Sequence, residues 1–220
     1  QVCCKAGSPR AVRAAMKIFA TLILALAVTP AHASYFLGES AAVDSTVGNK
    51  IALDVVLKPN AQPAKVRVQL RPEWAPLGVE QFKKLVANGS LNGAAFFRVV
   101  PDFIVQFGLP AIPQQKRMAP LQDDPVLDGV SNKRGTLVFA TAGPDTRTNQ
   151  LFINLANNAG LDAQGFSPIG EIIEGMETVD EINPEYGEKP DQGLITASGN
   201  EYLDQEFPNL SKIRSAVTVE

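Results

Sequence analysis

Short runs of apolar and β-branched residues, separated by turn-forming residues, fill most of the chain after residue 50. Runs of this length predict strands, and the alternating VRVQL sequence is typical of a strand with one buried face. The predicted strands are Ile51–Leu57, Ala64–Leu70, Ala95–Val100, Phe103–Phe107, Thr136–Thr141, Gln150–Leu155, Pro168–Ile173, Gly193–Ala197 and Ala216–Val219.

A few stretches show helical spacing instead. The first begins near Pro76, where a proline costs little, and has Val79, Phe82 and Leu85 on one face before a terminating Gly89. Many short strands with few helices predict one mainly β domain over residues 50–220, a closed or nearly closed barrel. The other predicted helices are Gly175–Ile182 and a short C-terminal helix that Asn200 caps and that ends before Pro208.

One connection is unusually long. It runs from Gly108 to about Arg134 and is rich in Pro, Asp and Gln. A loop of this length inside a compact domain is usually functional or mobile, so this segment is a candidate for either.

The segment Met16–Ala33 predicts a secretory signal peptide. Lys17 precedes the apolar run Ile18–Val28, and a small-x-small site ends at Ala33. The apolar run is shorter than the roughly 20 residues that span a bilayer, so cleavage is favoured over an uncleaved anchor. We therefore expect residues 1–33 to be leader, 34–49 to be a linker, and the protein to be secreted, periplasmic or lumenal. Residues 1–15 are either upstream translated sequence or part of a longer targeting leader.

Removal of residues 1–33 changes the available chemistry. Both cysteines and the single histidine disappear, and 16 basic residues remain against 23 acidic ones, a net charge of −7. Without His or Cys, a serine nucleophile activated by His and a thiol nucleophile are excluded. Zinc sites normally draw on Cys and His, so the residues disfavour one, and we expect no metal and no cofactor. A negative surface repels phosphate, so we expect no nucleic-acid partner, and no membrane partner after cleavage.

The segment FFRVVPDFIVQFG carries the strongest chemical signal. It places Arg98 among aromatic and aliphatic residues, with Phe103 and Gln106 a few positions later. If the two strands of this segment pair, these three side chains can share one face. A guanidinium beside an aromatic surface and an amide acceptor is a prepared array of hydrogen-bond donors. The alternative is an arginine that only extends from a core strand to solvent.

The segments WAPLGVEQFKKLV, FFRVVPDFIVQFG and GTLVFATAGPDTRTNQLFINLANNAGLDAQGFSPIGEIIEGMETVDEI resemble the cyclophilin family in order and spacing. The resemblance covers roughly residues 74–182, and the tail resembles the extension of bacterial-type and plastid-like members. It implies a mainly β fold, a closed eight-stranded antiparallel cyclophilin-like β-barrel capped by two helices, with a short extra C-terminal helix. It also implies peptidyl-prolyl cis–trans isomerase activity on proline-containing polypeptides.

The resemblance implies a role for each matching position. Arg98 corresponds to the catalytic arginine, Gln106 to the amide that orients it, and Phe103 to part of the catalytic pocket. The substrate-binding positions that it implies are Ile104, Ala140, Thr141, Ala142, Gln150, Phe152, Leu161 and, across a one-residue length difference, Phe166.

Three positions depart from the pattern of the family. Gly160 stands where cyclosporin-binding members carry a tryptophan, so we predict weak cyclosporin binding. Thr141 replaces an asparagine, and Phe166 aligns near a pocket histidine. A monomer is the default expectation for the family. An active isomerase is the first hypothesis, and a chaperone or scaffold that binds proline peptides with little turnover is the alternative.

Overall fold

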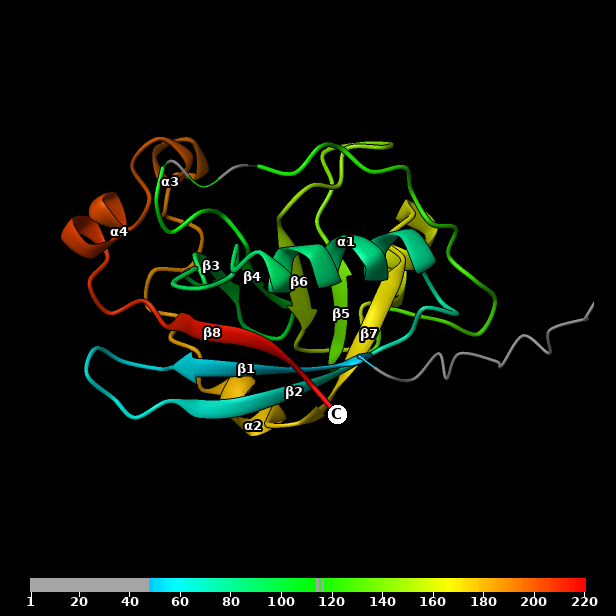
Figure 1. Ribbon diagram of the computed structural model, residues 1–220, viewed down its shortest axis with the longest axis horizontal. Coiled ribbons are helices and arrows are strands. Elements are labelled where there is room, and N and C mark those ends of the chain that lie inside the picture. The colour runs from blue at the N-terminus through cyan, green and yellow to red at the C-terminus, as the bar shows by residue number, and fades with distance from the viewer. Residues whose placement is uncertain (1–47, 114, 116) are drawn as a thin grey trace, which may run out of the picture. The chain divides into compact units, whose positions relative to one another are not determined.

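The structure is a computed structural model that describes residues 48–113, 115 and 117–220. The predicted leader and most of the predicted linker lie outside the described residues. Within them, eight antiparallel strands form one curled sheet in the order β3-β4-β6-β5-β7-β2-β1-β8 (Figure 1). The strands are β1 (Lys50–Val56), β2 (Ala64–Leu70), β3 (Arg98–Val100), β4 (Ile104–Phe107), β5 (Thr136–Phe139), β6 (Leu151–Asn154), β7 (Pro168–Glu174) and β8 (Lys212–Val219).

The two ends of the sheet are joined through the chain that enters β3. Ala95 forms a bridge with Lys212, and the Gly93 amide donates to the Ile213 carbonyl at 2.7 Å. The mainly β, eight-stranded antiparallel prediction is therefore confirmed. The sheet is closed by residues 93–95, which pair with β8, and not by a ladder between β3 and β8. Ala95 was predicted to be part of the strand that in the structure begins only at Arg98.

The sheet encloses a core of aliphatic and aromatic side chains. Phe96 and Phe107 meet edge to face with ring centroids 5.3 Å apart. Helix α1 (Pro76–Ala87) buries Val79 and Phe82 in the same core and contacts β7 and β8. The remaining helices are η1 (Ala159–Gln164), α2 (Met176–Asp180), α3 (Gln192–Ser198) and α4 (Asn200–Glu206), of which α2 contacts β2.

The C-terminal tail differs from its prediction. Residues 193–197 form α3 and not a strand, because Asp191 accepts a hydrogen bond from the Leu194 amide at 2.8 Å and caps a helix there. The tail therefore has two helices where one was predicted. Gly199, with φ +60°, is the N-cap residue of α4, and the predicted cap Asn200 instead donates to the Gly93 carbonyl.

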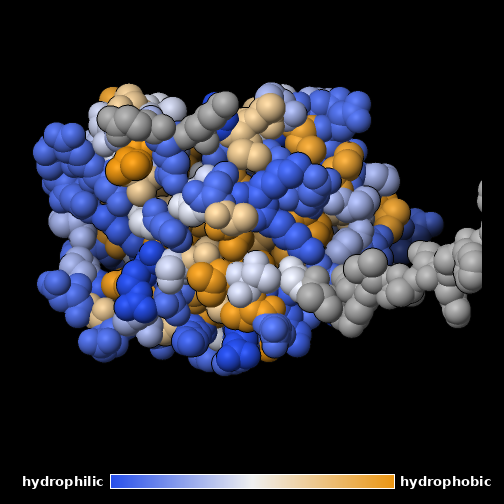
Figure 2. Space-filling model, in the orientation of Figure 1, coloured by the Kyte–Doolittle hydropathy of each residue, from blue (hydrophilic) through white to orange (hydrophobic). Residues whose placement is uncertain are grey.

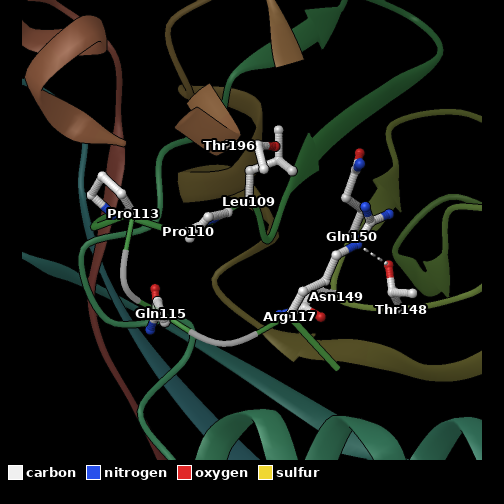
Figure 3. A pocket seen from close by; sticks show the side chains of 9 residues that line it. All are labelled: Leu109, Pro110, Pro113, Gln115, Arg117, Thr148, Asn149, Gln150 and Thr196. Carbon is white, nitrogen blue, oxygen red and sulfur yellow. Dashed lines mark hydrogen bonds between the residues drawn. The ribbon is translucent and has the colours of Figure 1, made fainter. Parts of the chain in front are cut away.

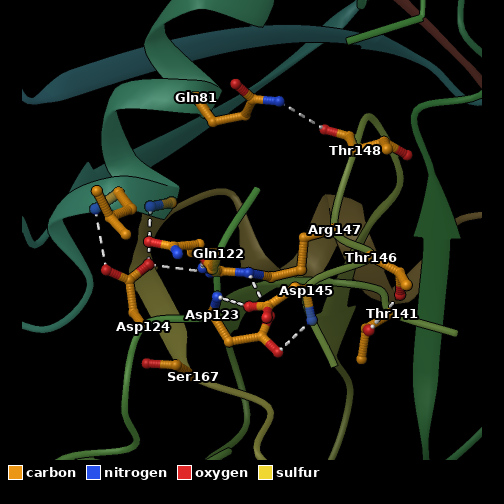
Figure 4. Close-up of polar contacts among 12 residues, drawn as sticks. Gln81, Gln122, Asp123, Asp124, Thr141, Asp145, Thr146, Arg147, Thr148 and Ser167 are labelled. Atoms are coloured by element: carbon orange, nitrogen blue, oxygen red, sulfur yellow. Dashed lines mark hydrogen bonds and ion pairs between the residues drawn. The ribbon is translucent and has the colours of Figure 1, made fainter. Parts of the chain in front are cut away.

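A buried ion pair anchors the long connection between β4 and β5 (Figure 4). Asp124 accepts hydrogen bonds from the Leu77 and Gly78 amides at 2.9 and 2.8 Å, so it occupies the N-terminus of α1. Arg147 lies 2.9 Å from both Asp124 and Asp123. The side chains of Asp124 and Arg147 are only 1% and 5% exposed, which makes this contact a fixed point of the fold.

On the face in Figure 2, hydrophilic residues predominate and hydrophobic ones form small groups. The exposed large hydrophobic residues belong to different elements, for example Leu77 in α1, Ile173 in β7 and Leu194 in α3. No described helix has the length and apolar character needed to cross a bilayer.

We expect Asp124→Ala to destabilise the fold strongly, because it removes the acceptor at α1 and leaves Arg147 with one carboxylate fewer. Breaking a buried ion pair from one side costs about 3–5 kcal/mol. Urea denaturation measures the change, with the exposed Asp128→Ala in the same connection as control. A loss equal to that of the control would contradict the anchoring role.

Candidate active site

The β3–β4 hairpin aligns the polar groups of the site. Arg98 and Gln106 are directly opposed in the ladder, and the Arg98 Nη1 donates to Gln106 Oε1 at 3.2 Å. The Gln106 amide in turn donates to Gln150 Oε1 at 2.8 Å. Three side chains from β3, β4 and the start of β6 therefore form a continuous hydrogen-bonded row that orients the guanidinium.

An apolar pocket of about 160 Å³ opens beside this row. Its floor is made by the buried side chains of Ile104 and Phe152, and Phe166 meets Phe152 edge to face at 5.7 Å. The pocket thus combines one cation with aromatic and aliphatic walls. Its lining residues are Arg98, Phe103, Ile104, Gln106, Ala140, Thr141, Phe152, Leu161 and Phe166.

Two of the predicted site residues lie outside that lining. Gln150 reaches the site through Gln106, and Ala142 is exposed next to the pocket segment. The amides of Ala140 and Ala142 are already used within the protein, by the Gln150 carbonyl and the Thr146 hydroxyl at 2.9 Å each. Thr141 is half-buried, and its hydroxyl is also bonded within the protein, to Thr146 at 2.8 Å.

Gln150 lines a second pocket, of about 230 Å³ (Figure 3). It is formed where the long connection passes the residues just before β6, and α3 contributes Thr196 to its wall. Gln150 lines this pocket and bonds the row beside the first one, so a single side chain links the two. The other lining residues are Leu109, Pro110, Pro113, Gln115, Arg117, Thr148 and Asn149.

One polar contact of the site was missed by sequence reasoning. Glu188 Oε1 lies 2.6 Å from both Nε and Nη2 of Arg98. The two residues are 90 positions apart, and Glu188 falls outside the segments that carry the family resemblance. Only the fold reveals this ion pair.

A buried amide network supports the apolar wall from behind. Asn154, which is fully buried, donates to Asn132 and Thr136 at 3.1 and 2.8 Å. Asn158 donates to the Phe103 carbonyl at 2.9 Å. Because buried polar groups are costly unless they are paired, these bonds fix the backbone beneath the pocket.

Asp162 ties η1, which carries Leu161, to this network. It accepts from the Asn132 amide at 2.8 Å and from the Ser131 hydroxyl at 2.5 Å. Burial alone would raise the pKa of the Asp162 carboxyl, but the hydrogen bonds from Ser131 and Asn132 outweigh that effect and lower the pKa. The ionised form is therefore the one that the fold prefers.

Among residues 48–113, 115 and 117–220, no three side chains of His, Cys, Asp or Glu are grouped so that they could hold a metal ion. The site offers the hydrogen-bond donors of Arg98 beside an apolar cavity.

Comparison with known proteins identifies the family of the chain. Residues 56–199 match the family described as cyclophilin type peptidyl-prolyl cis-trans isomerase/CLD. The peptidyl-prolyl cis-trans isomerase A of Dickeya dadantii is 35% identical over 73% of this chain and 83% of its own length. A peptidyl-prolyl cis-trans isomerase of Acinetobacter baylyi is 36% identical over 53% of this chain and 65% of its own length.

Solved structures share the fold. A cyclophilin from Hirschia baltica superposes with a TM-score of 0.54 at 19% identity, over 78% of this chain and 74% of its own. A cyclophilin type peptidyl-prolyl cis-trans isomerase from Cryptosporidium parvum reaches 0.56 at 19% identity, over 78% of this chain and 98% of its own.

The Asp162 contacts generate a test by pH. A carboxyl whose pKa is lowered by folding stabilises the native state above its unfolded value, here 3.8, and that stabilisation is lost as pH falls through the folded pKa. We expect Asp162→Asn to be less stable at neutral pH, and the difference from wild type to shrink below pH 3.8.

Urea unfolding at several pH values measures both curves. The other carboxylates titrate in both proteins, so the difference between the two unfolding free energies isolates the contribution of Asp162. The control is Asp128→Asn, at an exposed residue. A difference that stays constant down to the acid end would contradict the role of the Asp162 charge.

Proposed function

The chain belongs to the cyclophilin-type peptidyl-prolyl cis–trans isomerase family and is an isomerase of this type, and we propose that its catalysis depends on Arg98. The family match also implies substrates that contain proline. The relatives are named as isomerases, which favours turnover over the alternative of a scaffold that only binds proline peptides.

Prolyl isomerisation requires rotation about a partial double bond. The planar amide resists rotation by about 18–20 kcal/mol because the nitrogen lone pair is delocalised into the carbonyl. In the twisted state this lone pair is localised on nitrogen and becomes a hydrogen-bond acceptor. A donor aimed at it therefore stabilises the transition state more than either planar isomer, which is what raises turnover.

The observation that supports Arg98 as this donor is its placement. The guanidinium is held by Gln106 at the edge of the apolar pocket, and its side chain is only 27% exposed. A charge-assisted hydrogen bond is stronger where water is excluded. An acceleration typical of enzymes needs about 8 kcal/mol or more of transition-state stabilisation, of which one well-placed donor contributes roughly 3–4.

The apolar walls fit the proline ring. We assign the ring to the surface formed by Phe103, Ile104, Phe152, Leu161 and Phe166, because a compact hydrocarbon ring loses water favourably there. The peptide before the proline is then placed along residues 140–142. The second pocket, which Gln150 lines, is suited to a side chain of that peptide.

Two finer expectations concern inhibitors and assembly. Gly160 carries no side chain, and a Cβ added there would meet no heavy atom within 4 Å, so the surface that a tryptophan would provide at this position is absent. We therefore propose weak cyclosporin binding, which inhibitor titration measures. We also propose a monomer, which sedimentation measures.

The location remains a proposal from the sequence. A signal peptide at Met16–Ala33 would direct the domain to a secreted, periplasmic or lumenal compartment, where it would assist folding. After cleavage, residues 34–49 would form an N-terminal linker ahead of the domain, which we place from about residue 50.

We expect Arg98→Ala to lower kcat/KM on a proline peptide by about 10²–10³-fold, the typical cost of removing one transition-state donor. Peptide affinity, measured by NMR titration, should change far less, because the apolar walls remain. Arg98→Lys should recover only part of the rate, since an ammonium lacks the planar fork.

The matched control is Arg134→Ala, which removes an arginine paired with Asp180 outside the pocket. A few-fold loss or less in Arg98→Ala would overturn the proposed mechanism. Tight peptide binding with negligible turnover in the wild type would favour the scaffold alternative instead.

The leader generates a separate prediction. Expression of the chain from Met16 in a secretion-competent bacterium should give a mature protein that begins at Ser34. N-terminal sequencing of the purified protein decides this, with Ala33→Arg as the variant expected to block cleavage. A membrane-bound product that retains Met16–Ala33 would establish the anchor alternative.

A further inference from the structure

The guanidinium of Arg98 is held from two sides. Gln106 accepts from Nη1, and the carboxylate of Glu188 lies 2.6 Å from Nε and from Nη2. Because an arginine carries its five N–H groups in one rigid plane, contacts on Nε and Nη1 define the direction of the whole fork. The remaining N–H groups, one on each terminal nitrogen, are the ones left for a substrate.

The backbone beside Glu188 is fixed to the catalytic strand. The Val99 amide, next to Arg98, donates to the Gly187 carbonyl at 3.1 Å. In Figure 1 the chain between α2 and α3 accordingly runs past β3. Gly187 has φ +57°, in the left-handed region, which turns the chain so that Glu188 follows directly opposite Arg98.

The C-terminal extension holds this segment in turn. The Tyr186 ring meets Phe207, the residue after α4, edge to face with centroids 5.2 Å apart. The Tyr186 hydroxyl also accepts a hydrogen bond from the Asn209 amide at 3.3 Å. The C-terminal helices, of which α3 was wrongly predicted as a strand, therefore have a structural connection to the pocket through residues 186–188.

We propose that Glu188 is a positioning residue for Arg98 and that the C-terminal extension serves the isomerase by presenting it. The inference rests on the proposed role of Arg98. An opposite charge on the Nε edge restrains a flexible side chain and leaves the terminal nitrogens directed at the pocket. Glu188 itself lines a different surface depression and not the pocket of Arg98, so its effect passes through the guanidinium.

The alternative effect of Glu188 would be competition. A carboxylate that drew the guanidinium away from the pocket would slow the enzyme, and its removal would raise the rate. The geometry opposes this, since Arg98 lines the pocket and bonds Gln106 while it contacts Glu188. The two effects have opposite signs and are therefore separable.

NMR exchange on an uncharged proline peptide, at saturating peptide, gives the isomerisation rate on the enzyme, and titration gives the affinity. We expect Glu188→Ala to lower that rate roughly three- to fivefold, the upper range for an ion pair whose carboxylate is 61% exposed, with affinity unchanged. Glu188→Gln keeps a hydrogen-bond acceptor without the charge, so its rate should lie between those of the wild type and of Glu188→Ala. Glu181→Gln, at the residue after α2, is the control for charge alone.

Salt provides a readout that a merely structural role would not move. Raising ionic strength from about 0.01 M to 1 M shortens the screening length from roughly 30 Å to 3 Å. The wild-type rate should fall toward that of Glu188→Ala, while the variant stays constant. Equal salt dependence in both proteins would overturn the proposal.

A double-mutant cycle separates this inference from the proposed function. In an Arg98→Ala background, Glu188→Ala should have no further effect on the rate, because the only route of its influence is gone. If Arg98→Ala keeps its activity, the proposed mechanism fails. If Arg98→Ala loses activity while Glu188→Ala matches or exceeds the wild type, only the positioning role of Glu188 fails.

Discussion

The register of the β3–β4 hairpin is the constraint on which the site depends. It sets Arg98 opposite Gln106, so the cation has an acceptor on one side and the apolar pocket on the other. A shift of β3 by one residue would send Arg98 to the opposite face of the sheet from Gln106. Only three residues, including Asp102 at φ +59°, connect β3 to β4, and a loop this short fixes the register of the hairpin.

Two sets of polar residues around Arg98 and Gln106 stabilise different parts of the site. The apolar wall needs a rigid backbone, which the buried amides of Asn132 and Asn154 and the half-buried amide of Asn158 supply through mutual hydrogen bonds. The long connection needs a fixed path, which Asp124 supplies at the N-terminus of α1. Both sets use polar groups that are largely buried and bonded, since an unpaired one would cost more than the contact contributes.

The sequence allowed the barrel strands and the chemical core of the site to be predicted, because both are local patterns. Arg98, Phe103 and Gln106 fall within nine residues of a hairpin, and the structure places all three around one pocket. The helix at residues 192–198 was wrongly predicted as a strand, because its short β-branched run outweighed the capping signal of Asp191. Local propensity is a weak guide in segments this short.

Contacts between distant parts of the chain were beyond the reach of such patterns. Asp124 caps a helix that begins 48 residues earlier, and Glu188 meets an arginine 90 residues away. Neither residue differs in type from the many exposed acidic residues around it. Only the folded chain distinguishes them.

The choice of an arginine has a consequence for the conditions under which the site functions. An arginine side chain stays protonated at any physiological pH, and the amides of glutamine and asparagine do not titrate. The donor that we propose for the reacting bond therefore needs no particular pH, in contrast to enzymes that rely on histidine. Among the supports of the site, Asp162 is sensitive to acid, because the hydrogen bonds from Ser131 and Asn132 that hold η1 also lower the pKa of its carboxyl. The proposed donor and the Asp162 support are thus different side chains, so a loss of stability through Asp162 at acid pH would act on the scaffold that carries Leu161 and not on the donor itself.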